Sequence, residues 1–231
     1  MKPGKIITTI GIIFIAAAVL LTSYNIADQL RAEKAAESTA STLRQEIEEL
    51  KKIAENQKEE EETQKENTTG LPDENFAQIQ YKEEETTAET STTAEADETV
   101  DIKTFELNGE EYVGIISLPS IGIELPVYAE CTTEKLKTAP CAEYGSLTTG
   151  DFVICAHNYR GHFGKIGNLR IGDSVVFTDV EGNTYNFYVA EQETLKSTDV
   201  EAMKTSGYPL TLYTCTLDGN RRVTVRCDAA G

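Results

Sequence analysis

The chain has 231 residues, 39% of them apolar, and carries a formal net charge of −18. This length allows one domain of medium size with extensions, because a domain of roughly 130 residues can bury a hydrophobic core. No basic patch is present in the sequence, which argues against a nucleic-acid-binding protein.

The first 27 residues contain an apolar run that is long enough to cross a bilayer. Residues 6–27 carry no charge, and a helix of about 20 apolar residues spans the hydrocarbon core. Lys2 and Lys5 precede the run and acidic residues follow it, so the positive-inside rule places residue 1 in the cytoplasm and the remainder outside. A cleaved signal peptide is the alternative, although Asn25 and Ala27 make a poor cleavage pair.

Residues 28–69 have the composition of a helical stalk. Leu43, Ile47, Leu50 and Ala54 recur at helical spacing, which permits either a short coiled coil or a solvated helix. An acidic linker is expected at 70–104, because Glu, Thr, Ala and Ser dominate it and bury too little apolar area to offset the cost of ordering. Residues 28–100 hold 21 acidic against 8 basic residues, so most of the net charge lies outside the domain that follows.

Residues 105–231 show short apolar runs separated by turn signals, which is typical of an all-β barrel or sandwich. Two short helices are expected at 133–137 and 199–204, and the Gly-Asn pair at 182–183 predicts a hairpin turn. We expect strands near 112–117, 123–127, 152–156, 174–178, 184–195, 211–216 and 222–227.

The last two expected strands carry the side chains with the most distinctive chemistry. Asp218-Gly219-Asn220 is turn chemistry between them, so Cys215 ends one strand and Arg222 begins the next. His157 follows another apolar strand where a polar loop starts. A thiolate can attack a carbonyl, an imidazolium can protonate the leaving amine, and a guanidinium can stabilise an oxyanion. Together these residues predict acyl transfer.

Three motifs resemble those of the sortase family of Gram-positive surface transpeptidases. They are Thr-Leu-Tyr-Thr-Cys at 211–215, Arg-Val-Thr-Val-Arg at 222–226 and Ala-His-Asn at 156–158, and the run at 116–127 is similar to the opening strands of that family. The resemblance implies a closed barrel of about eight strands, with Cys215 as nucleophile and His157 and Arg222 as the other catalytic residues.

By the same resemblance, several further residues are candidates for substrate binding. Thr214, Thr216 and Tyr159 are expected to contact substrate, and the backbone N–H of Thr216 would join Arg222 at the oxyanion. The loop 196–210 would recognise the substrate. Arg221 is the less favoured match to the family's arginine, because that arginine directly precedes the apolar strand.

The resemblance implies cleavage of a Leu-Pro-x-Thr-Gly-like sorting signal in a secreted protein, and transfer of its acyl group from Cys215 to an amine. The amine would come from a cell-wall precursor or from a pilin lysine. Two other functions stay open: a membrane-anchored cysteine protease that only hydrolyses, and a surface β-barrel that binds without catalysis. No cofactor is expected.

The remaining cysteines permit other interpretations. An odd count of five leaves at least one thiol free, and Cys131 and Cys141 are the pair that a disulfide would join, although the sequence does not decide this. Cys155 and Cys227 lie in apolar runs and are expected to be buried. Cys155, His157 and His162 could form a zinc site, but paired ligands from two loops are lacking, so no metal is expected.

Overall fold

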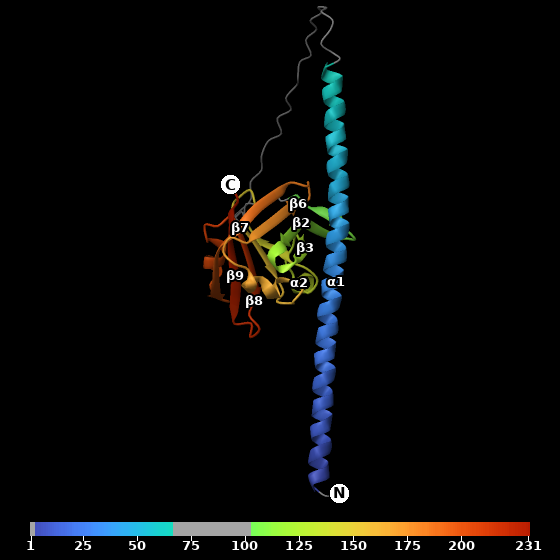
Figure 1. Ribbon diagram of the computed structural model, residues 1–231, viewed down its shortest axis with the longest axis vertical. Coiled ribbons are helices and arrows are strands. Elements are labelled where there is room, and N and C mark those ends of the chain that lie inside the picture. The colour runs from blue at the N-terminus through green and yellow to red at the C-terminus, as the bar shows by residue number, and fades with distance from the viewer. Residues whose placement is uncertain (1–2, 67–102) are drawn as a thin grey trace, which may run out of the picture.

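The computed structural model describes residues 3–66 and 103–231, and the side chains of 8–56 and 103–231. A long helix, α1 (Pro3–Glu66), and a β-barrel lie side by side, with the barrel against the middle of the helix (Figure 1). Lys2 and nearly all of the linker expected at 70–104 lie outside the described residues.

Residues 103–231 form one sheet that closes on itself. The order of strands is β1-β2-β3-β4-β5-β8-β9-β7-β6, and an additional pairing of β2 with β6 closes eight of them into a ring with β1 outside it. The pairs β3–β4 and β5–β8 are parallel, whereas the others are antiparallel. The expected closed barrel of about eight strands is confirmed. The strands are β1 (Phe105–Leu107), β2 (Glu110–Leu118), β3 (Ile123–Tyr128), β4 (Cys141–Tyr144), β5 (Phe152–Ala156), β6 (Ser174–Asp179), β7 (Thr184–Lys196), β8 (Leu210–Cys215) and β9 (Arg221–Ala229).

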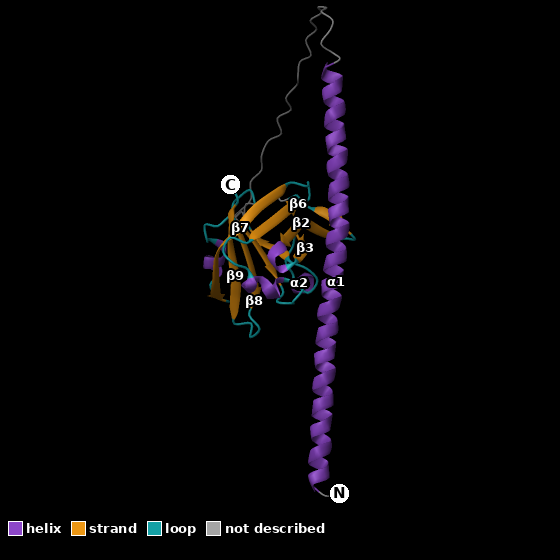
Figure 2. Ribbon diagram, in the orientation of Figure 1, coloured by secondary structure: helices purple, strands orange, loops and turns teal. Residues whose placement is uncertain are grey.

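The helices of the barrel domain are short, as Figure 2 shows. The two helices expected from the sequence are α2 (Thr133–Leu136) and α3 (Val200–Lys204). Two 3₁₀ turns, η1 (Pro119–Ile121) and η2 (Phe163–Asn168), were not expected, and neither were the strands β1 and β4. The other seven strands lie within two residues of their expected ends.

Closure of the barrel depends on a glycine in β2. Gly114 has φ of 153°, and a Cβ at this position would collide with the carbonyl of Thr178 on β6. The ladder between β2 and β3 also shifts register beside Gly114, as at a β-bulge. The absence of a side chain therefore lets β2 approach β6 and close the ring.

The middle of α1 packs onto the barrel through one stripe of its surface. Ala36, Ala40, Leu43 and Ile47 are at most 3% exposed and recur at helical spacing, and β3 is the main element they meet. Burying Leu43 and Ile47 stabilises this contact by about 1.5–3 kcal/mol each. The apolar positions expected to form a coiled coil or a solvated stalk thus divide, because Leu50 and Ala54 are exposed whereas Leu43 and Ile47 join the core.

Candidate active site

Cys215 is the last residue of β8 and is exposed. Directly across the antiparallel ladder, it pairs in register with Arg222 of β9. The turn between the strands is closed by the N–H of Thr216, which donates to the carbonyl of Arg221 over 2.9 Å, and by Gly219, whose φ of 73° suits a glycine. The expected hairpin is present, and it places the thiol beside the arginine at one end of the barrel.

His157 follows directly on β5, the parallel neighbour of β8. Ala156, the last residue of β5, pairs with Thr214, so the next residues on the two strands are His157 and Cys215. The Thr214 hydroxyl donates to the Ala156 carbonyl over 2.8 Å and ties the two strand ends together. Residues almost sixty positions apart in the sequence therefore leave the barrel side by side.

The histidine is held by stacking rather than by a carboxylate. The rings of His157 and Tyr159 stack with centroids 3.8 Å apart, and the Tyr159 hydroxyl donates to Asp28 of α1 over 3.5 Å. Burial lowers the pKa of His157, an effect that a hydrogen bond with Asn158 opposes; the charge of Lys137 lowers this pKa further, and that of Asp28 raises it. A lowered pKa keeps the imidazole neutral at neutral pH, the form that accepts a proton.

The second histidine has a different place. His162 is fully buried, and burial, followed by the charge of His157, lowers its pKa to about 4. Its two ring nitrogens have no hydrogen-bond partner of normal geometry among the described residues, although backbone groups of Ala32 and Thr138 lie near the ring. His162 is therefore a packing residue beneath α1, while His157 stands at the strand end.

A groove of about 570 Å³ opens beside Cys215. One wall comes from the hairpin, and the other from the segment that follows His157. Thr214 and Thr216 contribute to the first wall, whereas Tyr159 lies behind His157 against α1. The lining residues are Asn158, Phe163, Gly164, Gly167, Thr214, Cys215, Thr216, Leu217, Asp218, Arg221 and Val223.

Arg222 borders a second and smaller hollow, which Cys215 does not line. This cavity of about 120 Å³ is also lined by Tyr213 and by residues of β7 and α3. In the structure, the Arg222 guanidinium donates to the carbonyls of Gly219 and Arg221 over 3.1 and 3.2 Å. The expected oxyanion donor, the N–H of Thr216, is likewise engaged within the turn. The N–H of Thr216 and the Nη1 of Arg222 are thus both engaged within the turn.

Arg226 is a buried arginine of β9 that was not among the residues expected to be important. It is 2% exposed and forms an ion pair with Glu193 of β7 at 2.8 Å. Its guanidinium also donates to the carbonyls of Ala202 and Met203 in α3 and to the hydroxyl of Thr211. One buried cation thus fixes the loop between β7 and β8 against the barrel. A charged residue inside an apolar strand was the feature of the sequence that could have indicated its buried role.

Four cysteines serve the structure. Cys131 and Cys141 form a disulfide, and the Sγ of Cys155 lies 3.1 Å from that of Cys131 and 3.6 Å from that of Cys141. Cys155 and Cys227 are buried, as expected. The three clustered sulfurs could hold a metal ion only if the disulfide were reduced, because its two sulfurs are bonded to each other. The expected neighbour in such a site, His157, is not part of the cluster.

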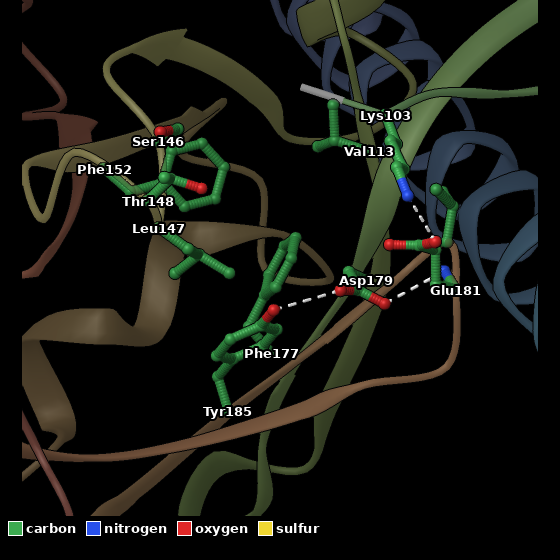
Figure 3. Close-up of a pocket in the computed structure, with 11 residues that line it drawn as sticks. Lys103, Val113, Ser146, Leu147, Thr148, Phe152, Phe177, Asp179, Glu181 and Tyr185 are labelled. Carbon is green, nitrogen blue, oxygen red and sulfur yellow. Dashed lines mark hydrogen bonds and ion pairs between the residues drawn. The ribbon is translucent and has the colours of Figure 1, made fainter. Parts of the chain in front are cut away.

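Another pocket lies away from this chemistry. It has a volume of about 170 Å³. Figure 3 shows Phe177, Tyr185 and Asp179 in its lining, together with the ion pair of Lys103 and Glu181. Asp179 accepts a hydrogen bond from Tyr185, so its carboxylate is occupied within the protein. No cysteine or histidine lines it, whereas Cys215 lines the groove described above.

One helix among the described residues, α1, is long and apolar enough to cross a membrane. The qualifying stretch lies near the N-terminus, where the large apolar side chains of 10–26 are exposed. Such a helix indicates a membrane anchor.

Comparisons with known proteins agree with one another. Residues 116–230 match the family model of the sortase domain. Sortase A of Bacillus anthracis is 26% identical over 161 residues, covering 66% of this chain and 76% of that protein. Among solved structures, sortase C of Clostridium perfringens SM101 has 21% identity and a TM-score of 0.44, covering 52% of this chain and 70% of that one. Sortase A of Corynebacterium diphtheriae has 22% identity and a TM-score of 0.47, with coverages of 53% and 62%.

This match covers both strands of the hairpin and the segment that holds His157. The family and the closed barrel support a transpeptidase role in general terms. Residues 116–230 of the chain therefore match a sortase domain.

Proposed function

We propose that the protein is a membrane-anchored cysteine transpeptidase that cleaves a Leu-Pro-x-Thr-Gly-like sorting signal through an acyl-enzyme on Cys215. The observation that carries the proposal is that three residues stand at neighbouring strand ends at one end of the barrel. Cys215 pairs with Arg222 across one ladder, and His157 follows the strand that pairs with β8 on its other edge. A groove large enough for several residues of extended peptide opens at the thiol.

The first half-reaction begins with the thiol proton. His157, kept neutral by burial, accepts the proton of Cys215, and the thiolate attacks the carbonyl carbon of the substrate threonine. The carbonyl oxygen becomes an oxyanion. Arg222 stabilises it by exchanging its bonds to the Gly219 and Arg221 carbonyls for bonds to the substrate. The imidazolium of His157 then protonates the leaving amine, and a thioester remains on Cys215.

The second half-reaction repeats these roles in reverse. An amine enters the groove, loses a proton to His157 and attacks the thioester, so an amide forms and Cys215 recovers its proton. The amine is supplied by a cell-wall precursor or by a pilin lysine. Cys215 is exposed, so water competes for the thioester, and hydrolysis without transfer is the second function that this observation favours.

The experiment uses the full chain in detergent, because Leu43 and Ile47 of α1 belong to the core of the barrel domain. It is incubated with a library of Leu-Pro-x-Thr-Gly peptides, with and without an amine acceptor, and the products are weighed by mass spectrometry. Conjugates that disappear in Cys215→Ala and persist in Cys227→Ala support the proposal. The Cys227 change removes a buried thiol of the neighbouring strand and leaves the nucleophile in place.

The outcomes separate the candidate functions. Cleavage that needs Cys215 but yields no conjugate with any amine would favour a protease. Absence of cleavage with every peptide would contradict both enzymatic proposals and leave a binding module.

A further inference from the structure

The long helix α1 has an exposed apolar stretch followed by a stretch that packs on the barrel, and this order determines where the barrel lies relative to the apolar stretch. Between residues 10 and 26 its large apolar side chains are exposed to at least 48%. From Asp28 onward, the same helix packs on the barrel, with Leu43 fully buried and Arg44 in an ion pair with Glu124 of β3 at 2.7 Å. Lys51 reaches the carbonyl of Gly182. The barrel is therefore attached along the part of the helix that directly follows its apolar stretch.

The candidate active site lies at the end of this attachment that is nearer the apolar stretch of α1. Asp28, one of the first charged residues after the apolar stretch, accepts the hydrogen bond of Tyr159, which stacks on His157. Lys51 contacts the turn between β6 and β7 at the other end of the barrel. Asp28 and Lys51 are 23 positions apart, or about 35 Å at 1.5 Å per residue. One continuous helix thus sets both the distance and the tilt of the catalytic groove relative to the apolar stretch.

The loop between β8 and β9 extends from the barrel at this same end. In Figure 1 it is the red loop below the labels β8 and β9, on the side of the barrel that faces the N-terminal part of α1. Leu217 at the start of this loop is 98% exposed, the highest exposure among the large apolar side chains of the described residues. Covering an apolar side chain that is held fully in water with an apolar environment is favourable.

Charges around Leu217 indicate what would cover it. Arg221 and Lys196 are exposed and pair in register on β9 and β7 beside the loop. Asp218, the acidic residue of the loop, is occupied by hydrogen bonds from Thr216 and Asn220. An exposed leucine flanked by two cations fits an interface of apolar chains below anionic headgroups.

We propose that the β8–β9 loop docks on the lipid bilayer that holds α1, with Leu217 in the interface and with Arg221 and Lys196 at anionic headgroups. The proposal rests on the membrane anchor proposed above. It makes the catalytic groove open at the membrane surface, since Cys215 and Leu217 line the same groove. An acyl donor or an amine held at that surface would meet the thiol without leaving the membrane.

The test places a spin label at single positions of the full chain in vesicles of phosphatidylcholine and phosphatidylglycerol. The background is Cys215→Ala, so the labels do not react there, and the remaining cysteines are buried or in a disulfide. Leu217→Cys is compared with Glu181→Cys in the β6–β7 turn, at the far end of the barrel. The relative accessibility of each label to oxygen and to a water-soluble nickel complex gives its depth.

We expect the label at 217 to lie about 5–10 Å below the headgroup surface and the label at 181 to remain in water. The depth at 217 should decrease when phosphatidylglycerol is omitted, or when Arg221→Gln and Lys196→Gln are combined. A label at 217 as aqueous as the label at 181 would overturn the proposal.

A third label at Val19→Cys separates this proposal from the anchor. If the label at 19 lies in lipid while the label at 217 lies in water, docking is wrong and the anchor stands. If both lie in water, the anchor fails and docking fails with it. Because these measurements require no turnover, they are independent of whether the protein proves to be a transpeptidase.

Discussion

Cys155 and Cys215 lie on the neighbouring parallel strands β5 and β8, yet their surroundings are opposite. Cys155 pairs with Tyr213, so Cys215 is only two residues further along in register. Cys155 is 4% exposed, and burial raises the pKa of its thiol, as does the charge of Glu143. Cys215 is exposed at the strand end opposite Arg222. The same functional group is thus inert within the barrel and available two residues later, because the strand has ended.

The sharpest test of this comparison is alkylation of the native protein. Iodoacetamide should modify Cys215 faster than Cys155 by at least about 100-fold, because a local opening that costs about 3 kcal/mol exposes Cys155 less than about 1% of the time. Peptide mapping by mass spectrometry measures both rates in one sample. Equal rates in the native state would show that burial does not control these thiols, and unfolding in urea should remove the difference.

Arg222 lies opposite Cys215, whereas Tyr213 lies opposite Cys155. Replacing Arg222 therefore tests what this arginine contributes at Cys215. Arg222→Lys keeps the charge but loses the planar fork that can hold an oxyanion with two donors. We expect kcat to fall about 100-fold, as when one oxyanion donor is removed, with the rate of Cys215 alkylation changed much less. Arg170→Lys, at an exposed position outside both hollows beside Cys215, is the matched control.

Arg221→Lys completes that experiment, because the two arginines are adjacent in the sequence. A large loss of kcat in Arg221→Lys together with normal activity in Arg222→Lys would reverse the assignment. The register of the hairpin, in which Arg222 and not Arg221 faces Cys215, is the reason to expect the opposite.

The disulfide lies against the Sγ of Cys155. Removing it should therefore make Cys155 more reactive and reduce the difference between Cys155 and Cys215. Cys131 and Cys141 are ten positions apart, and a bridge over a loop of this length stabilises a domain by about 3 kcal/mol. The double change Cys131→Ser and Cys141→Ser should lower the free energy of unfolding by that amount in urea titration. It should also speed alkylation of Cys155, whose sulfur then loses its two sulfur neighbours. Unchanged stability and unchanged labelling would contradict the structural role of the bridge.

The sequence predicted the hairpin because that information is local. Alternating apolar residues define β8 and β9, and the Asp-Gly-Asn turn fixes which residues face each other across it. The short strands β1 and β4 escaped prediction, since three or four residues carry little periodicity.

The contacts of α1 with the barrel could not be predicted for a different reason. Ala36 and Ala40 are small and have no pattern that distinguishes a packed face from a solvated one, and the pairing of Tyr159 with Asp28 joins positions 131 residues apart. Arg226 was missed because its partners in α3 and β7 are distant in sequence. The closeness of Cys155 to the disulfide also arises only when β4 pairs with β5.

The two histidines repeat the contrast between the two cysteines, with a smaller expected effect. His162 is fully buried with a pKa of about 4, whereas an unfolded histidine has a pKa near 6.5, so the unfolded chain binds a proton first as the pH falls. Stability due to the neutral form is complete above about pH 6.5 and is lost as the pH falls toward 4. Between pH 7.5 and pH 5 we expect the free energy of unfolding to decrease by about 2 kcal/mol through this residue.

Urea titrations of the wild type and His162→Gln at both pH values measure this loss, which should be missing in the variant. Nuclear magnetic resonance gives a direct check, since the chain has only two histidines. One imidazole should titrate near pH 4, and the signal that remains in His162→Gln, from His157, should show a pKa below the usual value. Titration of the His162 imidazole near pH 6.5 would show that α1 does not seal the loop beneath it. The depth of that burial, rather than the presence of a histidine, is what distinguishes His162 from His157.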